Sequence, residues 1–557
     1  MNCHHCQQPF TVTEEDKAFY TKVSPEIKGT KLPLPEPTLC PPCREQRRMA
    51  FRNERKLYNR RCDLTQKQII SLYAPDSKYK AYETSAWWGD SWDAQDYGRE
   101  FDFNQPFFPQ FQALQLAVPR MSLNTMNNEN SDFTSFAGFN KNCYLIHTAD
   151  QNEDCYYGVY ALRNKNCVDF LFCYDNELCY EVRDSNKCTN VFWGENISSC
   201  YDSFFIEDCI NCHDCIMCVG LTHKSYCYKN KQYTQEEFHQ IKSDLLTDFS
   251  VKLAEYKNSF KAFSLTIPHP SIHITNADGC TGDFIQNSHN LTHCFDISKA
   301  EDCKYCSFIE NCKDSYDWTF YSDRGELGYE LANVATNVYH CLFSTNCWGR
   351  STSLLYCDLC QFCENCFGCV GLKKQKYCIF NKQYSEADYF TLITKIIHHM
   401  QKTKEWGEFF PINLSPFAYN ETVAQEYYPL KKESAAEQSI AWKNIEEYNR
   451  YEGQKCLPPD DIKQVTDSIL KDILTCSTCE KNYRIISQEL QFYRAHNLPV
   501  PKECFNCRHQ NRVNARNGRK LYQRTCNNCQ KEITTTYHPD RPEIIYCQDC
   551  YQQKVLN

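Results

Sequence analysis

The stretch CINCHDCIMCVGLTHKSYCYKNKQY, residues 209–233, has a close second copy in the same chain, CQFCENCFGCVGLKKQKYCIFNKQY at residues 360–384. Five cysteines, the tripeptide Val-Gly-Leu and the tetrapeptide Asn-Lys-Gln-Tyr fall in the same register in both copies. A second copy this similar predicts that the centre of the protein is an internal duplication.

Cysteines recur at regular steps ahead of the first copy. Many follow Asn, Asp, Lys or Ser and precede an apolar stretch, as in NKNCVDFLF at 164–172 and SSCYDSFF at 198–205. This pattern predicts short strands and polar corners in a repeat of about 18–24 residues, with no room for helices. The predicted fold is therefore a β-dominated multidomain protein: a duplicated parallel β-solenoid, like a right-handed β-helix, with helical caps and flanking zinc-ribbon modules.

Each copy of the repeated stretch is followed by a helix signal. A hydroxyl residue precedes an acid by three positions, Thr234 with Glu237 and Ser385 with Asp388, which is typical of a helix N-terminus. Apolar residues at helical spacing follow. We expect these helices to cover the ends of the two solenoid halves.

The central cysteines allow more than one interpretation. A free thiol behaves as a small buried hydrophobic group, which favours packing. The clusters Cys209–Cys218 and Cys360–Cys369 resemble an iron–sulfur run, but their last gap is two residues and no proline follows. Packing, zinc and an iron–sulfur cluster remain alternatives for these clusters.

Paired C-x2-C knuckles lie towards both ends of the chain. Two knuckles supply four thiolates, which complete the tetrahedron that zinc prefers. We therefore predict about three zinc ions per chain. The predicted ligands are Cys3, Cys6, Cys40 and Cys43, then Cys476, Cys479, Cys504 and Cys507, then Cys526, Cys529, Cys547 and Cys550.

Arginines follow the second knuckle at both ends, at spacings that place them on one face of a helix. They either contact the phosphate backbone of RNA, or neutralise thiolates and acidic neighbours within the protein, or are simply solvated. These candidate nucleic-acid-binding residues are Arg44, Arg48, Arg52 and Arg55, and Arg508, Arg512, Arg516 and Arg519.

The N-terminal end also matches the second C-terminal ribbon, although with fewer thiols. The four ligand positions of that ribbon correspond to Cys62, Thr65, Glu83 and Ala86. We expect a degenerate, metal-free ribbon there. An aromatic strap over residues 86–119, with a short helix near 108–118, is expected to dock the N-terminal module on the central domain.

Both ends share paired knuckles, an acid-containing run that ends in Phe-Tyr, a proline shortly before the second knuckle, and Cys-Arg at its close. In these features they resemble the trcl-type probable zinc-binding domain, over about residues 1–50 and 473–515. The whole layout is similar to large uncharacterised cysteine-rich proteins of candidate-phylum bacteria. The resemblance implies zinc for the first two cysteine sets named above and implies no known activity.

The 557 residues contain 39 cysteines and carry a net charge of −9. In a chain this large without a visible leader or membrane span, we expect reduced thiols and a soluble, cytoplasmic protein. The predicted segments are an N-terminal zinc module (1–62), degenerate ribbon and strap (63–130), solenoid half 1 (131–233), cap and connector (234–277), solenoid half 2 (278–384), cap and connector (385–430), helical linker (431–475) and double zinc ribbon (476–557).

The motifs indicate a non-enzymatic zinc-binding scaffold or adaptor. Its terminal ribbons would contact RNA, the ribosome or an acidic protein, with no membrane or small-molecule substrate. An iron–sulfur or thiol redox protein is the alternative, and a β-helix enzyme acting on carbohydrate is a third. The sequence shows no nucleophile–base set, phosphate loop or metalloprotease motif, which argues against an enzyme.

Overall fold

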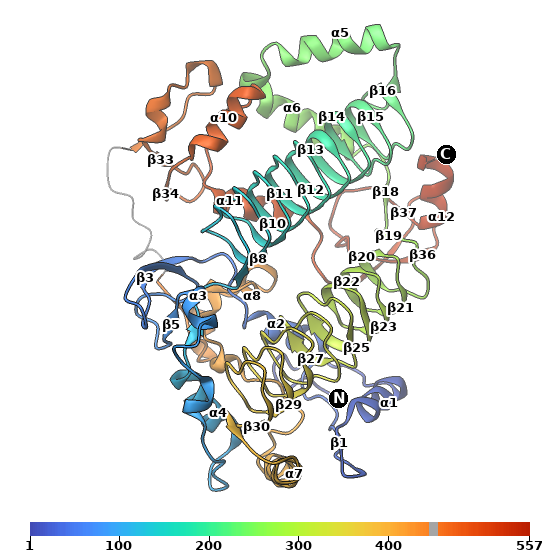
Figure 1. Cartoon of the computed structure of the whole chain (residues 1–557). Coiled ribbons are helices and arrows are strands. Elements are labelled where there is room, and N and C mark those ends of the chain that lie inside the picture. The colour runs from blue at the N-terminus through green and yellow to red at the C-terminus, as the bar shows by residue number, and fades with distance from the viewer. Residues whose placement is uncertain (445–454, 557) are drawn as a thin grey trace. The chain divides into compact units, whose positions relative to one another are not determined.

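A computed structural model of the chain describes residues 1–444 and 455–556 (Figure 1). The chain forms two compact units, and each unit joins one end of the sequence to one part of the centre. Unit 1 comprises Met1–Leu123 and Ile272–Lys443, and unit 2 comprises Asn124–Ser271 and Asn444–Asn557. Strands predominate in the central part of both units.

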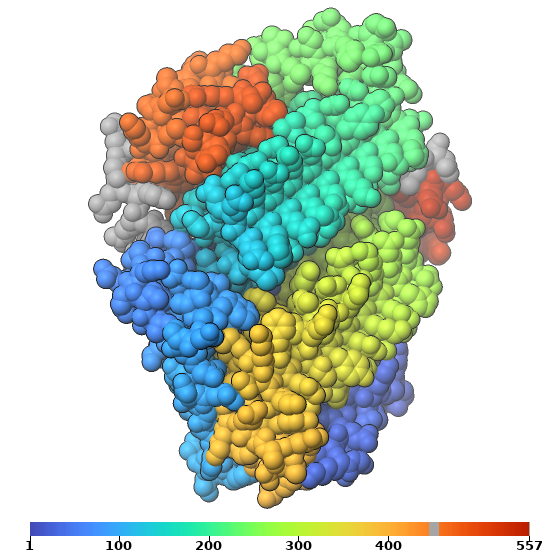
Figure 2. Space-filling model, in the orientation of Figure 1, coloured from blue at the N-terminus to red at the C-terminus, as the bar shows by residue number. Residues whose placement is uncertain are grey.

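Unit 2 contains an 11-stranded curled sheet in which each strand pairs with the next one in the chain. The pairs are parallel, except for the last pair. On the face shown in Figure 2, the successive turns of this segment form parallel rows of atoms. The strands are β7 (Thr125–Met126), β8 (Ser135–Gly138), β9 (His147–Asp150), β10 (Tyr156–Leu162), β11 (Val168–Tyr174), β12 (Tyr180–Asn186), β13 (Thr189–Ser198), β14 (Tyr201–Glu207), β15 (His213–Val219), β16 (Ser225–Tyr228) and β17 (Lys231–Gln232).

A left-handed corner at every third residue sets the geometry of this sheet. From Asn142 to Met217, every third residue has a φ between +49° and +60°. Asn and Asp tolerate this region better than most residues, which explains the polar corners of the sequence. Four three-residue sides close one turn, and Tyr156 accordingly pairs with Val168 at a separation of 12 residues.

The register of 12 residues between paired strands is shorter than the repeat of 18–24 residues expected from the cysteine spacing. The residue after each corner points to the interior, so interior positions recur every three residues around a turn. Two thiols 12 residues apart lie on the same side of successive turns, and two thiols 9 residues apart lie on different sides. In both cases the side chains face the interior. The cysteine spacing by itself therefore could not show whether one turn contains 9 or 12 residues.

The interior of the curled sheet in unit 2 is a stack of thiols, aliphatic groups and amides. One interior position carries buried cysteines in four successive turns, and the neighbouring position carries buried asparagines in four. The Asn164 amide donates to Asn152 Oδ1 at 3.0 Å and to the carbonyl of Cys173 at 2.8 Å. All 39 cysteines of the chain are free thiols. The stacks are Cys143, Cys155, Cys167 and Cys179, and Asn140, Asn152, Asn164 and Asn176.

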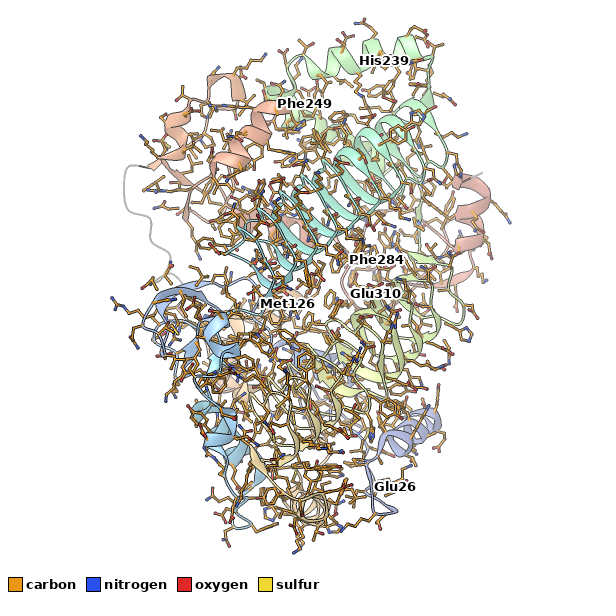
Figure 3. The ribbon with its side chains drawn as sticks, viewed as in Figure 1. Glu26, Met126, His239, Phe249, Phe284 and Glu310 are labelled. Carbon is orange, nitrogen blue, oxygen red and sulfur yellow. The ribbon has the colours of Figure 1, made fainter. Side chains whose placement is uncertain are left out.

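Helices follow the sheets of both units at the predicted places. In unit 2, α5 (Gln235–Leu246) begins with the expected capping box between Thr234 and Glu237, and α6 (Phe249–Ser264) follows. Figure 3 marks Met126 in β7, at one end of the sheet, and His239 on α5, beyond the other end. In unit 1, the side chain of Ser385 accepts a hydrogen bond at the start of α7 (Glu386–Thr403).

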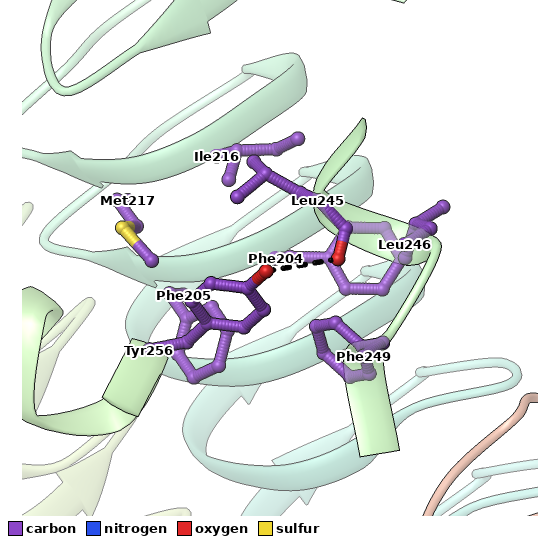
Figure 4. A pocket seen from close by; sticks show the side chains of 8 residues that line it. All are labelled: Phe204, Phe205, Ile216, Met217, Leu245, Leu246, Phe249 and Tyr256. Carbon is purple, nitrogen blue, oxygen red and sulfur yellow. Dashed lines mark hydrogen bonds between the residues drawn. The ribbon is translucent and has the colours of Figure 1, made fainter. Parts of the chain in front are cut away.

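In unit 2, α5 and α6 leave an open apolar depression against the sheet (Figure 4). The one polar side-chain atom of its lining is the Tyr256 hydroxyl, which donates to the carbonyl of Leu245 at 3.2 Å. The depression therefore offers no group for acid–base or nucleophilic chemistry. It is lined by Phe204, Phe205, Ile216, Met217, Leu245, Leu246, Phe249 and Tyr256.

Unit 1 contains a nine-stranded sheet and a four-stranded sheet, again with mostly parallel pairs. Some turns contain 13 residues, as where Tyr316 pairs with Tyr329. Trp318 is fully buried there, and a Cβ atom at Gly325 would lie 2.0 Å from its ring. The strands are β19 (Ile274–Thr275), β20 (Gly282–Gln286), β21 (His289–Thr292), β22 (Cys294–Ser298), β23 (Glu301–Lys304), β24 (Ser307–Glu310), β25 (Cys312–Thr319), β26 (Gly325–Glu326), β27 (Tyr329–Ala332), β28 (Thr352–Leu355), β29 (Glu364–Phe367), β30 (Lys376–Ile379) and β31 (Lys382–Gln383).

The remainder of unit 1 is built from short elements. The helix expected near 108–118 is α4 (Phe107–Ala117), and the backbone N–H groups of Phe107 and Phe108 donate to the carboxylate of Glu405. The other elements are α1 (Glu14–Val23), β1 (Glu26–Ile27), β2 (Thr30–Lys31), α2 (Pro41–Met49), β3 (Tyr58–Arg61), β4 (Gln68–Ser71), β5 (Ala81–Tyr82), α3 (Thr84–Trp88), β6 (Arg120–Met121), α8 (Ala424–Tyr427) and α9 (Lys432–Glu437).

The linker predicted over 431–475 is less helical than expected. Part of it, residues 445–454, lies outside the described residues. Two short 3-10 helices, Ile462–Gln464 and Asp467–Leu470, replace a predicted helix because the backbone of Val465 and Thr466 is extended. The other elements of unit 2 are β18 (His269–Pro270), β32 (Lys455–Cys456), β33 (Ile473–Thr475), β34 (Asn482–Tyr483), α10 (Ser487–Ala495), α11 (Phe505–Ala515), β35 (Tyr522–Thr525), β36 (Glu532–Thr535), β37 (Ile545–Tyr546) and α12 (Gln548–Tyr551).

Among the described residues, none of the helices combines the length and the apolar character needed to cross a membrane.

The asparagine stack gives a direct test of the interior. We expect Asn164→Ala to lower the free energy of unfolding by about 2–4 kcal/mol, because it leaves the carbonyl of Cys173 and the N–H of Asn176 without their buried partner. Chemical denaturation monitored by circular dichroism measures the change. Lys141→Ala, at an exposed position, is the control and should have little effect. Equal stability of the two variants would contradict this account of the interior.

Candidate metal centres

Three groups of four cysteines bring their sulfurs together, each within 4.8 Å of the others in its group. Sulfur–sulfur distances across the knuckles are 3.6 Å for Cys6 and Cys40, and 3.8 Å for Cys479 and Cys504. In a tetrahedral zinc site with Zn–S bonds of about 2.3 Å, two sulfurs lie about 3.8 Å apart. The groups are Cys3, Cys6, Cys40 and Cys43; Cys476, Cys479, Cys504 and Cys507; and Cys526, Cys529, Cys547 and Cys550.

The first knuckle of each group is a tight turn. A residue with positive φ directly follows the second cysteine, and its N–H donates to the carbonyl of the first cysteine. In the two C-terminal groups these residues are Glu480 and Gln530, and in the N-terminal group it is Gln7. The turn brings both sulfurs of the knuckle to one side.

The second knuckle of each group begins a helix. Cys40, Cys504 and Cys547 occupy the N-cap positions of α2, α11 and α12. The first turn of each helix then carries the last ligand of the group. Free N–H groups at a helix start favour the thiolate over the thiol, so the local structure suits a bound cation.

Each group contains a thiol with a lowered pKa. The hydrogen bond from the thiol of Cys43 lowers the pKa of Cys40 to about 5. Burial raises the pKa of Cys476, but backbone N–H groups of Cys479 and Cys504 lower it further, to about 7. N–H groups likewise outweigh burial at Cys526, whose pKa falls to about 6. A metal ion would therefore meet a group that is already partly ionised near neutral pH.

The degenerate ribbon keeps the shape of its C-terminal counterpart. The hairpin β3–β4 pairs Tyr58 with Ser71, just as the hairpin β35–β36 pairs Tyr522 with Thr535. Cys62 Sγ accepts hydrogen bonds from the N–H groups of Thr65 and Glu83. With one thiol among its four matched positions, this ribbon forms no group of three ligands in the part of the chain that the structure describes.

The N-terminal arginines are engaged within unit 1. Arg44 and Arg48 lie on α2, which ends at Met49, so Arg52 and Arg55 fall outside the predicted helix. Arg44 and Arg48 are 1% and 0% exposed and pair with Asp317 on β25. Arg48 also bonds Glu330, Arg52 lies over the ring of Phe320 at 4.4 Å, and Arg55 pairs with Glu426.

The C-terminal arginines make a matching set of contacts within unit 2. Arg508 and Arg512 on α11 are 4% and 3% exposed, and both pair with Asp169 on β11. Arg512 also bonds Glu181, while Arg516 pairs with Asp184 and lies over the ring of Phe172 at 4.1 Å. Arg519 lies in the segment between α11 and β35.

These contacts correspond to the second interpretation of the arginines, in which they neutralise acidic neighbours within the protein. A buried guanidinium paired with a carboxylate is not available to a phosphate unless the pair opens. Contact of these side chains with RNA would therefore require both ends to leave the sheets on which they pack.

The clustered central cysteines are four successive interior positions of one turn. The sulfurs of Cys209, Cys212, Cys215 and Cys218 are buried, and each donates to the carbonyl two residues earlier, at 3.2–3.4 Å. The sulfurs of Cys360, Cys363, Cys366 and Cys369 are also buried and donate to the carbonyl two residues earlier, at 3.3–3.7 Å. Among the described residues, neither cluster forms a group of three ligand atoms within 4.8 Å. This arrangement favours packing over a metal cluster.

A further cluster of titratable side chains, which the sequence did not predict, lies in unit 2. His269 on β18 is 1% exposed, and its Nδ1 atom lies 3.1 Å from Asp208 and 3.6 Å from Glu207. Its Nε2 atom lies 3.2 Å from the carbonyl of Ser264. Because both ring nitrogens face acceptors, the imidazolium fits better than a metal-bound imidazole. The only local feature that distinguishes His269 in the sequence is that a proline flanks it on each side.

No protein-family model and no curated protein matches the chain. Among solved structures, a putative acetyltransferase from Desulfovibrio desulfuricans is similar over 47% of this chain and 69% of its own, with 8% identity and a TM-score of 0.11. The comparisons thus give no support to the resemblance to the trcl-type domain or to proteins of candidate-phylum bacteria. The cysteine groups that this resemblance implied are nevertheless present.

The buried histidine predicts a pH dependence. Burial lowers the pKa of His269, but the hydrogen bond and charge of Asp208 and the charge of Glu207 raise it further, to about 9. The ion pair of His269 with Asp208 therefore stabilises the fold fully below the unfolded pKa of about 6.5, and this stabilisation is lost as the pH rises through 9. Its size is on the order of 3 kcal/mol.

We expect His269→Gln to remove this contribution, so that the difference in unfolding free energy from the wild type shrinks between about pH 6 and pH 10. Denaturant titrations at each pH measure it. His239→Gln, at an exposed position on α5, serves as the control. A difference that is constant over this range would argue against a charged His269.

Proposed function

We propose that the protein is a non-enzymatic, zinc-binding scaffold with three tetrathiolate centres. The observation that carries this proposal is the assembly of twelve thiols from distant knuckles into three closed groups of four. Four protein sulfurs complete the coordination of zinc and leave no open position for a substrate, which is the character of a structural site.

The thiolate set supports zinc over harder cations. Soft sulfur ligands select zinc, copper(I) or iron–sulfur clusters, whereas magnesium and calcium prefer oxygen. Pairs of C-x2-C knuckles on hairpin turns are the usual frame of a zinc ribbon. An iron–sulfur or thiol redox protein that uses the central clusters is the second candidate, and its only support is the cysteine spacing of those clusters.

We further propose that the curled sheets are two halves of a duplicated parallel β-solenoid. The repeated sequence at 209–233 and 360–384 supports this, as does the register of about 12 residues in both units. The paired arginine contacts of the two terminal modules support it independently. In this proposal the solenoid halves are rigid platforms, and the zinc ribbons are modules fastened to them.

Zinc analysis tests the proposal. We expect three zinc ions per chain and no iron in protein purified without oxygen. The double variant Cys479→Ser/Cys507→Ser should lower the content to two zinc ions, because two remaining thiols cannot hold the ion of that group. Inductively coupled plasma mass spectrometry gives both metals in one measurement.

Cys212→Ala and Cys363→Ala are the matched controls, since they remove one thiol from each central cluster and leave the three groups intact. Both should keep three zinc ions. Iron in the wild type with absorbance near 400 nm, lost in either control, would instead establish the iron–sulfur alternative.

A further inference from the structure

One buried arginine in each unit connects a carboxylate of the curled sheet to the backbone of a metal-binding knuckle. The arginine directly follows the last cysteine of its group: Arg44 follows Cys43, and Arg508 follows Cys507. Both side chains fold back toward the start of their own helix, so that one guanidinium reaches two partners.

In unit 1, Arg44 donates from Nε to Asp317 Oδ2 at 3.0 Å, and Nη2 lies 2.8 Å from the same oxygen. Its Nη1 donates to the carbonyl of Leu39 at 2.7 Å. Leu39 directly precedes Cys40, which is a ligand and the N-cap of α2. Arg44 and Asp317 are 1% and 0% exposed, so water does not compete for these bonds.

Unit 2 repeats the arrangement with other residues. The Nε atom of Arg508 lies 2.9 Å from Asp169 Oδ2, and Nη1 donates to the carbonyl of Glu503 at 3.0 Å. Glu503 directly precedes Cys504, the N-cap of α11. The same three-part bridge therefore occurs twice, between a sheet corner, a guanidinium and the carbonyl ahead of a ligand.

We propose that Asp317 and Asp169 are positioning residues for metal binding: each sets the zinc affinity of the neighbouring tetrathiolate group through the arginine bridge. This inference rests on the proposed zinc-binding function and adds to it a coupling between metal occupancy and the docking of each ribbon on its sheet.

The physical basis is the cost of ordering the knuckle. A metal site must hold two knuckles at fixed separation, and groups that orient the ligands contribute to affinity. The bridge already holds the carbonyl next to Cys40 or Cys504 in the protein without metal. Metal binding therefore has to immobilise less of the knuckle backbone. Linkage makes the effect reciprocal: metal that fixes the knuckle also strengthens the docking of the arginine on its carboxylate.

The third group provides an internal comparison in the same molecule. Cys550 is followed by Tyr551 rather than by arginine. Its contacts are of another kind, such as the hydrogen bond from the Asn528 side chain to Cys550 Sγ at 3.1 Å. Because this group belongs to unit 2, it experiences any general loss of stability in that unit without sharing the bridge of Arg508.

The experiment measures zinc affinity at each group separately, in the full-length chain. Zinc-loaded protein is equilibrated with increasing chelator, exposed thiols are alkylated briefly, and peptide mass spectrometry reports which group has lost its metal. We expect Asp317→Asn to weaken zinc binding about 10–100-fold at Cys3, Cys6, Cys40 and Cys43 only. Asp169→Asn should do the same at Cys476, Cys479, Cys504 and Cys507 only.

Arg44→Lys and Arg508→Lys serve as second variants, because lysine keeps the charge but cannot reach both partners of the bridge. They test the effect of the bridge on zinc affinity if either aspartate variant fails to fold. Alkylation of the buried interior cysteines shows whether a variant is folded. Thr319→Val is the matched control: it removes a bond to Arg48 on the same helix at 3.1 Å and leaves Arg44 untouched.

The outcomes distinguish failure of the arginine bridge from failure of zinc binding itself. Weakening confined to the bridged group supports the inference. Unchanged affinity in both bridge variants overturns it, and so does equal weakening of both unit 2 groups in the Asp169→Asn variant, which would reflect general stability. A wild-type chain that takes up no zinc at any group refutes the proposed function itself.

Discussion

The left-handed corner at every third residue is the constraint on which the rest of the structure depends. It fixes three-residue sides and, with four sides to most turns, the register of the parallel strands. It also decides which residues face inward, and so why thiols and amides stack in columns. Bulky residues such as Tyr157 and Trp193 accept this strained conformation because stacked neighbours and packed helices hold them in place.

The same corners create the surfaces on which the terminal modules pack. Asp169 and Glu181 are both corner residues, and so is Phe172, over which Arg516 lies. A side chain at a corner projects away from the interior, so acids placed there can meet arginines from another segment. The resulting ion pairs are buried, which makes them sensitive to the loss of either partner.

The helix that begins at the second knuckle, α2 in unit 1 and α11 in unit 2, connects the cysteine group to the sheet. The helix start holds two ligands, and the arginine in its first turn reaches the sheet. The cysteine group and the sheet are thus joined through one short helix, and the group could hold a metal ion. The protein therefore combines an interior in which buried thiols pack with terminal modules in which four thiols converge and could hold a metal ion.

The sequence by itself determined the features that depend on local spacing. Knuckle pairs predicted which cysteines converge in three groups of four, hydroxyl–acid pairs predicted the starts of α5 and α7, and polar corners predicted short parallel strands. Spacing could not give the length of a turn, because thiols 9 and 12 residues apart both face inward. Only the tertiary structure decided which ribbon packs on which sheet, and that the arginines are buried there. Residues such as Arg508 and Asp169 are brought together by long-range packing, and a buried ion pair leaves no periodic signal in the chain.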